Sequence, residues 1–416
     1  MDTNKKIFAC IDESEELAVE LESGLTKRPA ISPASGGEGE LDRCVFLEEW
    51  LKARGIDRLE RHDAPDAQAK GGVRPNLIAT IPGKSDGRRL WIISHLDVVP
   101  PGEASLWESD PFRVVRKDDA PLGPRLIGRG VEDNQQGLVS SVLAALALLN
   151  GGLTPPHTVK LLFCADEEMG SEYGVGWLMK ENPELFRGDD VVLIPDAGDT
   201  SGGVIEIAEK NIIWARFTTS GLQAHGSRPD LGINAHLAGA DLALRLYYGL
   251  SEKFHEKDGL FEPDYSTFQP TKKEANVPNV NTIPGEDVFC MDMRVLPRYP
   301  VKTVTAEIDR IKAEVEAKHG VKISYTLLQA AESKATSPDA PFVKSLSAAV
   351  REVYGVETRS IGIGGGTVAA FFRNAGIDAA VWARLCDTAH QPNEYALISN
   401  ILGDAKVMAA LMLEER

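Results

Sequence analysis

The sequence predicts an α/β fold in which a mainly parallel sheet is flanked by helices, with a smaller α+β domain inserted. Apolar runs of strand length occur at residues 88–95, 158–166 and 190–196, and we expect each to form a buried strand. These runs alternate with helical patterns, of which 137–149 is the most apolar. Strands that alternate with helices at this spacing are typical of a parallel sheet covered on both faces.

Two amphipathic helices are expected before the first of these strands. Their patterns cover residues 11–25 and 41–55, and Gly55 stops the second one. Pro29 and Pro33 mark the loop between them. The N-terminal segment is therefore expected to be helical.

The pattern changes after about residue 208. Residues 210–221 alternate like an antiparallel strand, and two helices and two further strands follow. This mixture indicates a small α+β domain. The expected helices are 234–250 and 303–320, and the expected strands are 210–221, 286–297 and 321–328.

The strand pattern of the first part returns near the C-terminus. Residues 380–390 again read as a strand followed by a candidate ligand. We therefore predict a catalytic domain formed by residues 1–208 and 329–416, with residues 209–328 inserted between them.

Composition limits the classes of partner. The formal net charge of -17 argues against nucleic acid or an anionic membrane as the main partner. The five scattered cysteines form no CxxC pair, which is typical of a reduced, cytoplasmic protein. The N-terminus is too polar for a secretory signal, and no apolar run reaches the roughly 18 residues of a membrane span.

Acids and histidines follow the predicted strands directly. His95, Asp166 and Asp196 fall at carboxyl ends of strands, where ligands bind in folds of this kind. Buried acids and histidines are costly unless they are paired or bind a cation. Asp97, two residues after His95, is a candidate to orient its imidazole. A purely structural histidine–aspartate pair would explain these two residues equally well.

Two further segments carry candidate ligands. Gly128 and Gly130 allow a tight turn from which Asp133 could bridge two metals, whereas Glu132 is expected to be solvated. A helix cap would also explain Asp133.

Three successive carboxylates at residues 166–168 repel one another unless cations or protons neutralise them. Different roles resolve this, with Glu168 as a metal ligand and Glu167 as a general base. A solvated acidic loop is the alternative.

The candidate residues are informative only as a set. Asp196 and His390 say little alone, but two histidines and three carboxylates, with a spare carboxylate as base, fit a paired-metal hydrolase. Such ligands favour zinc, with cobalt or manganese as substitutes. The chain has no GxSxG nucleophile elbow and no phosphate-binding loop of the Walker type. The glycine run at 362–367 indicates close backbone approach to a ligand.

These motifs together resemble the metallopeptidase family of acetylornithine deacetylase, succinyl-diaminopimelate desuccinylase, glutamate carboxypeptidase and aminoacylase. The resemblance rests on SHLDVVP at 94–100, W-x-x-DPF at 107–112 and DEE-x-GS at 166–171, and it extends from residue 35 to 395. It implies a two-zinc catalytic domain of the zinc-peptidase type. It also implies that the inserted domain is a lid, often used for dimerisation.

The resemblance assigns a role to each residue of the site. It implies that Asp133 bridges two metals, that Glu168 and Asp196 each bind one of them, and that Glu167 is the base. Asp97 would orient His95. The two remaining metal ligands are His95, on one metal, and His390, on the other.

The resemblance also assigns residues of the lid. It implies that His225 polarises the scissile carbonyl, often across a dimer, and that Asn281 and Arg294 hold substrate, the arginine by a carboxylate. Gly365, in the glycine run, is the remaining substrate contact. We expect a homodimer in which the strand near 210–221 is an exposed edge that pairs across a two-fold axis.

The predicted function is a dinuclear zinc amidohydrolase. It would cleave the amide bond of an N-acyl amino acid or short peptide through a metal-activated water, with a small molecule as its partner. A dipeptidase or aminopeptidase of the same family is the first alternative, and an inactive ligand-binding relative is the second. The chain departs from many members at 134–137, where NQQG replaces a lysine-containing stretch, and at Thr367 and Val368, which replace Ser–Asp.

Overall fold

The computed structural model describes residues 3–119, 121 and 123–415 of the chain, and it divides into two compact units. Unit 1 comprises Met1–Ile207, Thr336–Ser360 and Phe371–Arg416. Unit 2 comprises Ala208–Ala335 and Ile361–Ala370. The division into a catalytic and a lid domain, as functional modules, stays a prediction.

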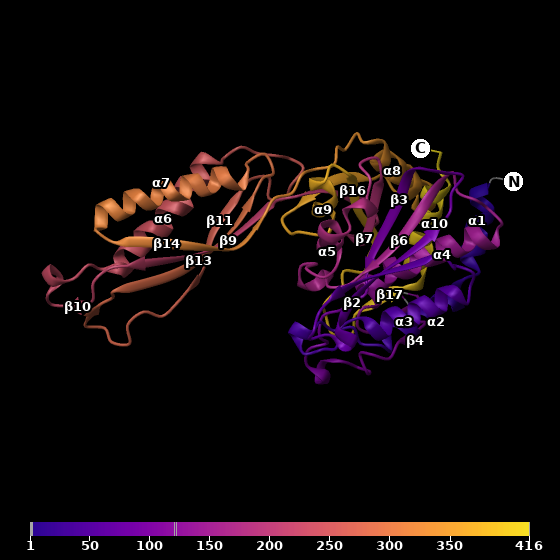
Figure 1. Cartoon of the computed structure of the whole chain (residues 1–416), viewed down its shortest axis with the longest axis horizontal. Coiled ribbons are helices and arrows are strands. Elements are labelled where there is room, and N and C mark those ends of the chain that lie inside the picture. The colour runs from indigo at the N-terminus through magenta and orange to yellow at the C-terminus, as the bar shows by residue number, and fades with distance from the viewer. Residues whose placement is uncertain (1–2, 120, 122, 416) are drawn as a thin grey trace. The chain divides into compact units, whose positions relative to one another are not determined.

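Unit 1 is built on an eight-stranded sheet in the order β1-β2-β6-β3-β7-β16-β8-β15 (Figure 1). The four central strands are parallel, whereas β1 and β2 pair antiparallel with their neighbours and β8 pairs antiparallel with β16. This mainly parallel sheet confirms the predicted fold class. The central strands are β6 (His157–Cys164), β3 (Ser85–His95), β7 (Val191–Asp199) and β16 (Asp378–Arg384); the outer ones are β1 (Leu59–Pro65), β2 (Val73–Ile81), β8 (Val204–Glu209) and β15 (Arg359–Ile363).

Helix α4 (Gly137–Asn150) is the central helix of unit 1. It packs against β3, β6 and β7 and lies beside α10 (Ile398–Leu413). Its first twelve residues are all buried, which matches a sequence that is apolar on every face. The start of this helix is thereby fixed against the carboxyl ends of the strands.

The N-terminal helical segment differs from the prediction. The expected single helix at 11–25 is two helices, α1 (Thr3–Asp12) and α2 (Glu15–Thr26). The break is at Ser14, whose hydroxyl donates to the carbonyl of Cys10. A serine that bonds to the backbone competes with helix continuation. The remaining helices that enter unit 1 are α3 (Leu41–Lys52), α5 (Val175–Glu181), α8 (Pro341–Tyr354) and α9 (Ala369–Asn374).

A small three-stranded sheet joins two segments that are far apart in sequence. Its order is β17-β5-β4, with β17 (Tyr395–Leu397) antiparallel to β5 (Arg125–Ile127) and β5 antiparallel to β4 (Val115–Lys117). This sheet therefore joins the segment that leads into α4 to the segment that leads into α10.

Unit 2 contains a four-stranded antiparallel sheet in the order β11-β13-β9-β14 with two helices packed on it. The core between sheet and helices includes Phe217, Leu242, Met293 and Ile308. Unit 2 also contains a two-stranded ladder of β10 (Ala224–His225) and β12 (Thr282–Ile283). In sequence, β10 follows β9 and β12 precedes β13. The main elements are β9 (Asn211–Ser220), β11 (Thr267–Lys273), β13 (Glu286–Val295), β14 (Lys322–Ala331), α6 (Ala235–Lys253) and α7 (Val301–His319).

The prediction that residues 210–221 form an edge strand is wrong. β9 pairs along its whole length with β13 on one side and with β14 on the other. Its alternating sequence marks one buried face of a strand, and this pattern is the same for central and edge strands. Within the described residues the edges of this sheet are β11 and β14.

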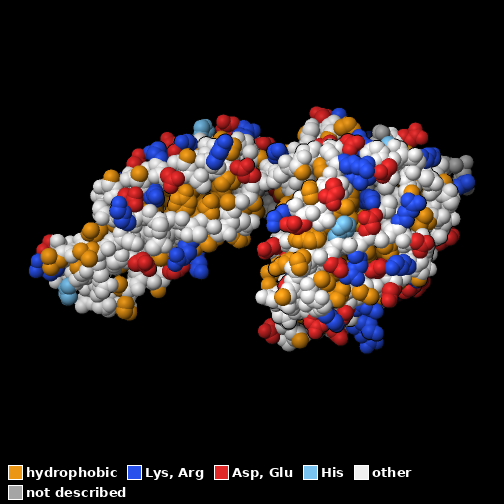
Figure 2. Space-filling view, in the orientation of Figure 1, with side chains coloured by type: hydrophobic (Ala, Val, Ile, Leu, Met, Phe, Trp, Pro, Cys, Tyr) orange, Lys and Arg blue, Asp and Glu red, His pale blue; other side chains and the backbone are white. Residues whose placement is uncertain are grey.

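The surface carries charges of both signs. Figure 2 shows acidic and basic side chains interspersed over the visible face of each unit. Among the described residues, no helix is long and apolar enough to cross a membrane. All five cysteines are free thiols.

Candidate metal centre

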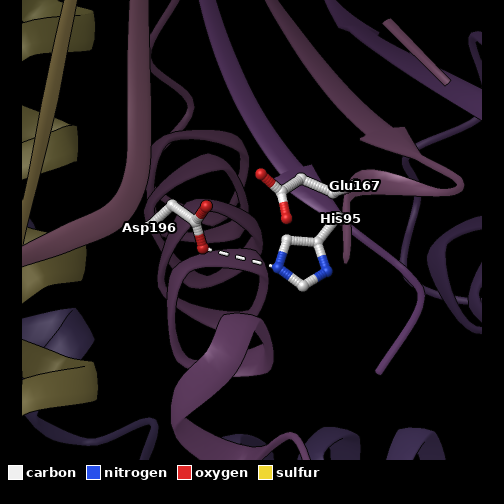
Figure 3. A group of neighbouring side chains, drawn as sticks. All are labelled: His95, Glu167 and Asp196. Carbon is white, nitrogen blue, oxygen red and sulfur yellow. Dashed lines mark ion pairs between the residues drawn. The ribbon is translucent and has the colours of Figure 1, made fainter. Parts of the chain in front are cut away.

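The carboxyl ends of three neighbouring parallel strands carry the first candidate ligands. His95 is the last residue of β3, and Asp196 lies in β7. Glu167 and Glu168 follow β6 in a single turn, Glu167–Met169. Because β6, β3 and β7 are adjacent, these side chains share one edge of the sheet. Figure 3 shows His95, Glu167 and Asp196 converging on a common point.

Asp133 lies between the two candidate histidines. It belongs to the turn Val131–Gln136 that precedes α4. One carboxylate oxygen, Oδ1, is 2.9 Å from Nε2 of His95, and the other, Oδ2, is 3.0 Å from Nε2 of His390. The carboxylate therefore faces one imidazole with each oxygen, which is the arrangement a bridging ligand requires.

Each histidine also faces a second carboxylate. Nε2 of His95 is 3.4 Å from Oδ1 of Asp196, and Nε2 of His390 is 3.1 Å from Oε1 of Glu168. In tetrahedral zinc sites the ligand atoms are about 3.4 Å apart, given zinc–ligand bonds of about 2.1 Å. The separations fall near this value. Two groups of three potential ligand atoms lie within 4.8 Å of one another: His95, Glu167, Asp196 and His95, Asp133, Glu168.

The described residues fit a pair of cations by their chemistry as well as by their distances. Burial, followed by repulsion from Asp196, raises the pKa of Glu167 well above its usual value. Hydrogen bonds to Asp133 and Glu168 raise the pKa of His390 to about 10. Burial opposes ionisation of Asp133, but hydrogen bonds from His390 and His95 hold its pKa below the usual range. Glu167 and His390 therefore bind protons more strongly than usual, and bound cations would displace these protons.

Asp97 fixes both His95 and the turn after β6. The main-chain oxygen of Asp97 is 3.0 Å from Nδ1 of His95, and its carboxylate Oδ1 is 3.5 Å away. The carboxylate accepts the backbone N–H groups of Glu167 at 3.0 Å and Glu168 at 3.1 Å. The predicted orienting contact thus comes mainly from the main chain, because the carboxylate is bonded to the neighbouring turn.

Asn134 connects Asp196 to His95 through hydrogen bonds, and the sequence did not single it out. Its side-chain nitrogen donates to Oδ1 of Asp196 and to the carbonyl of Pro195, each at 2.7 Å. Its side-chain oxygen accepts the backbone N–H of His95 at 3.3 Å. The sequence feature that could have identified Asn134 is its position directly after Asp133, in the NQQG stretch that replaces a lysine-containing one.

The expectation that Glu132 is solvated is wrong. Only 2% of this residue is exposed. Its carboxylate accepts the hydroxyl of Thr388 at 2.8 Å and the backbone N–H groups of Cys386 and Thr388. Donors from a loop more than 250 residues away cannot be anticipated from the local sequence. Glu394, within the HQPNEY segment, is also fully buried and was likewise missed.

His225 and Asn281 lie together in unit 2. His225 pairs with Thr282 across the β10–β12 ladder, and the carbonyl of Asn281 accepts the N–H of Gly226 at 2.7 Å. The exposed His225 ring accepts a backbone N–H at Nδ1 from Ser227, 3.1 Å away. Its Nε2 has no hydrogen bond among the described residues.

Arg294 and the glycine run also lie together in unit 2. Nη1 of Arg294 donates to the carbonyl of Gly364 at 2.8 Å, beside Gly365. Its Nε and Nη2 donate to Asp292 at 2.6 and 3.0 Å. A Cβ built on Gly365 would meet only Ile363, at 3.7 Å, so there is space beside this backbone.

The sequence is similar to that of known proteins along most of its length. Residues 91–414 match the sequence model of peptidase family M20/M25/M40. An uncharacterized metallohydrolase of Methanocaldococcus jannaschii is 36% identical over 411 residues, covering 95% of this chain and 99% of that protein. Succinyl-diaminopimelate desuccinylase of Cereibacter sphaeroides is 28% identical over 390 residues, covering 92% and 94%.

Solved structures share the fold. The aminopeptidase PepT from Bacillus cereus aligns with a TM-score of 0.75 at 18% identity, covering 96% of this chain and 98% of that one. The Bacillus subtilis YXEP protein, described as a dinuclear metal binding peptidase, aligns with a TM-score of 0.66 at 15% identity, covering 97% and 99%. At these identities the likeness supports the architecture.

Proposed function

Because the chain belongs to peptidase family M20/M25/M40 and is therefore a metal-dependent hydrolase, we propose that it is a dinuclear zinc amidohydrolase. Its substrates would be N-acyl amino acids or short peptides, of which it cleaves the amide bond. The placement of Asp133, with one oxygen toward His95 and the other toward His390, is the observation that carries this proposal.

Five side chains would hold the two ions. His95 and Asp196 would bind one, His390 and Glu168 the other, and Asp133 would bridge them. Bound zinc ions supply Lewis acidity toward the scissile carbonyl and lower the pKa of water. Cobalt or manganese would suit the same nitrogen and carboxylate ligands. The dinuclear description of the Bacillus subtilis neighbour agrees with this count.

Glu167 is the proposed general base. It lies beside His95 and Asp196 rather than in an ion pair with an arginine or lysine of the described residues. Burial, followed by repulsion from Asp196, raises its pKa, and two bound cations would offset this effect, so that the carboxylate could accept a proton from the attacking water. It would then deliver that proton to the leaving nitrogen.

Residues of unit 2 are proposed to bind the substrate. Nε2 of His225 would donate to the oxygen that becomes negative in the transition state. Asn281 and Gly365 would contact the substrate through polar and backbone atoms. Arg294 would bind an α-carboxylate, for which the substrate must compete with Asp292. A carboxylate-containing substrate and its amide, assayed side by side, test this last role.

The experiment that tests the function combines metal analysis with a substrate panel. We expect two ions per chain in the purified protein, and hydrolysis of N-acetyl or N-succinyl amino acids that stops when the ions are chelated and resumes when zinc is returned. A requirement for a free amine would instead identify a dipeptidase or aminopeptidase, which the aminopeptidase neighbour favours. Absence of bound metal would refute the proposal.

The cytoplasmic location stays a prediction.

A further inference from the structure

Two buried carboxylates join the loop of Asp133 to the loop of His390. Each carboxylate belongs to one loop and accepts hydrogen bonds from the other. We infer that Glu132 and Glu394 form a reciprocal clasp that fixes His390 against Asp133 and so determines the affinity of the metal position that His390 serves. This inference rests on the proposed dinuclear centre.

Glu394 holds the loop that carries Asp133. It is completely buried. Its Oε1 accepts the backbone N–H groups of Glu132 at 2.9 Å and Asp133 at 3.0 Å. Its Oε2 accepts the N–H of Gly130 at 2.9 Å and Nη1 of Arg129 at 2.6 Å. Four donors from residues 129–133 therefore converge on one carboxylate from the opposite loop.

Glu132 holds the loop that carries His390. It is also buried, and all of its donors come from Cys386 and Thr388. The hydroxyl of Thr388 in turn is bonded to both backbone groups of Tyr395, so the loop is closed on itself. Neither glutamate is one of the five proposed ligands, and the proposed chemistry uses neither.

The two histidines depend on this clasp to different degrees. The side chain of His95 is 2% exposed and ends a central strand, whereas that of His390 is 52% exposed. His390 also has φ of 64°, and Asp387 and Asn393 are left-handed as well. Such conformations are unfavourable for residues with a side chain. Because the imidazole of His390 is not fixed by packing, the hydrogen bonds of Glu132 and Glu394 must hold this loop in place.

Glutamine substitutions separate the clasp from simple volume. Both oxygens of Glu394 face N–H donors, so the amide nitrogen of Glu394→Gln meets donors in either orientation and at least two bonds are lost. In Glu132→Gln the oxygen can still face Thr388, and only the contact with Cys386 is lost. The first substitution should therefore weaken metal binding more than the second.

The test is a zinc titration of the apo-protein against a chelating indicator, which resolves two binding steps. We expect Glu394→Gln to weaken one of the two steps 10- to 100-fold, as is usual for groups that orient metal ligands, and the other step by a smaller factor. Glu132→Gln should weaken the same step by a smaller factor. Excess zinc should restore hydrolysis by Glu394→Gln, because the proposed base is intact.

Asp190→Asn is the matched control. Asp190 is equally buried and accepts bonds from Arg89, Trp91 and Arg187, and it directly precedes β7, at the end of the strand away from Asp196. The Asp190→Asn substitution should lower the melting temperature and leave both zinc-binding steps unchanged. Wild-type zinc affinity in both glutamine variants, or the same weakening in Asp190→Asn, would overturn the clasp. Failure of the wild type to bind zinc would instead refute the proposed function.

Discussion

Glu167 and Glu168 are adjacent in sequence, yet they face different neighbours. Glu168 is bonded to His390 at 3.1 Å, whereas Glu167 lies beside His95 and Asp196. We expect Glu167→Gln to keep two metal ions and to lower kcat by 10²–10⁴-fold, since the amide cannot accept a proton. Metal analysis and steady-state kinetics check this. Glu168→Gln is the matched partner and should lose metal. Activity of Glu167→Gln within tenfold of wild type would show that Glu167 is not the base.

Asn134 is expected to position Asp196. We predict that Asn134→Leu, which keeps the branched shape but removes both bonds at 2.7 Å, weakens binding of one zinc ion by about 10- to 100-fold. Asn211→Leu is the control, because Asn211 is a buried asparagine of unit 2 whose side chain bonds only to backbone groups and to none of the proposed ligands. If both variants bind zinc as the wild type does, Asn134 has no such role.

At the scale of elements, Asp404 links α10 to the turn before α4. It is completely buried and accepts bonds from Tyr354 and Gln136, each at 2.8 Å, and from the N–H of Arg384. Burial raises its pKa to about 7. Between about pH 4 and pH 7 the folded state therefore holds a proton that the unfolded state has released. The contribution of Asp404 to stability falls as pH rises through this window and is constant above it.

Asp404→Asn should remove this pH dependence. The asparagine oxygen can accept from Gln136 and Arg384, and its nitrogen can donate to the Tyr354 hydroxyl. Each pKa unit corresponds to about 1.4 kcal/mol, so we expect the variant to be more stable than wild type at pH 8 by roughly 2–4 kcal/mol and equally stable near pH 4. Denaturant unfolding at both pH values measures this difference. A variant that is less stable at pH 8 would contradict the prediction.

Strands that are apolar and continuous could be predicted from the sequence. Features that depend on contacts between segments far apart in the chain could not. The strands at 88–95, 158–166 and 190–196 agree with β3, β6 and β7, because a buried parallel strand is visible in its own residues. The central position of β9 is set by pairing with β13 and β14, which lie far along the chain. The ligands follow strand ends and could be proposed. Glu394 could not, since its donors are 261 to 265 residues away.

At the scale of the molecule, the two units should respond differently to metal. All five proposed ligands belong to unit 1. Ions that bind only the folded state stabilise it by mass action. We expect calorimetry to show that a chelator lowers the melting temperature of one transition by several degrees and leaves a second one unchanged. Returned zinc should reverse the shift. A single transition that shifts as a whole would show that the units unfold together.

Unit 2 has surfaces that suit association with a second copy. Within the described residues β14 is paired only with β9, so its outer edge presents unpaired backbone groups. On α6, Leu237, Leu244 and Tyr248 share one face and are 59%, 58% and 66% exposed. A two-fold axis beside this face of α6 would bury the same residues from both copies. The predicted homodimer would therefore form through α6 rather than through β9.

Subunit exchange tests whether such a dimer shares its sites. If His225 acts on the neighbouring subunit, His225→Ala and Glu167→Gln are each inactive alone, but one site of a mixed dimer contains both wild-type residues. Random exchange makes half of the dimers mixed, so activity should return to about a quarter of the wild-type value. A Leu244→Glu change, which places a charge in the proposed interface, should abolish both the dimer and the recovery. Verified exchange without recovered activity, or an active enzyme that sediments only as a monomer, would exclude a site completed by the partner.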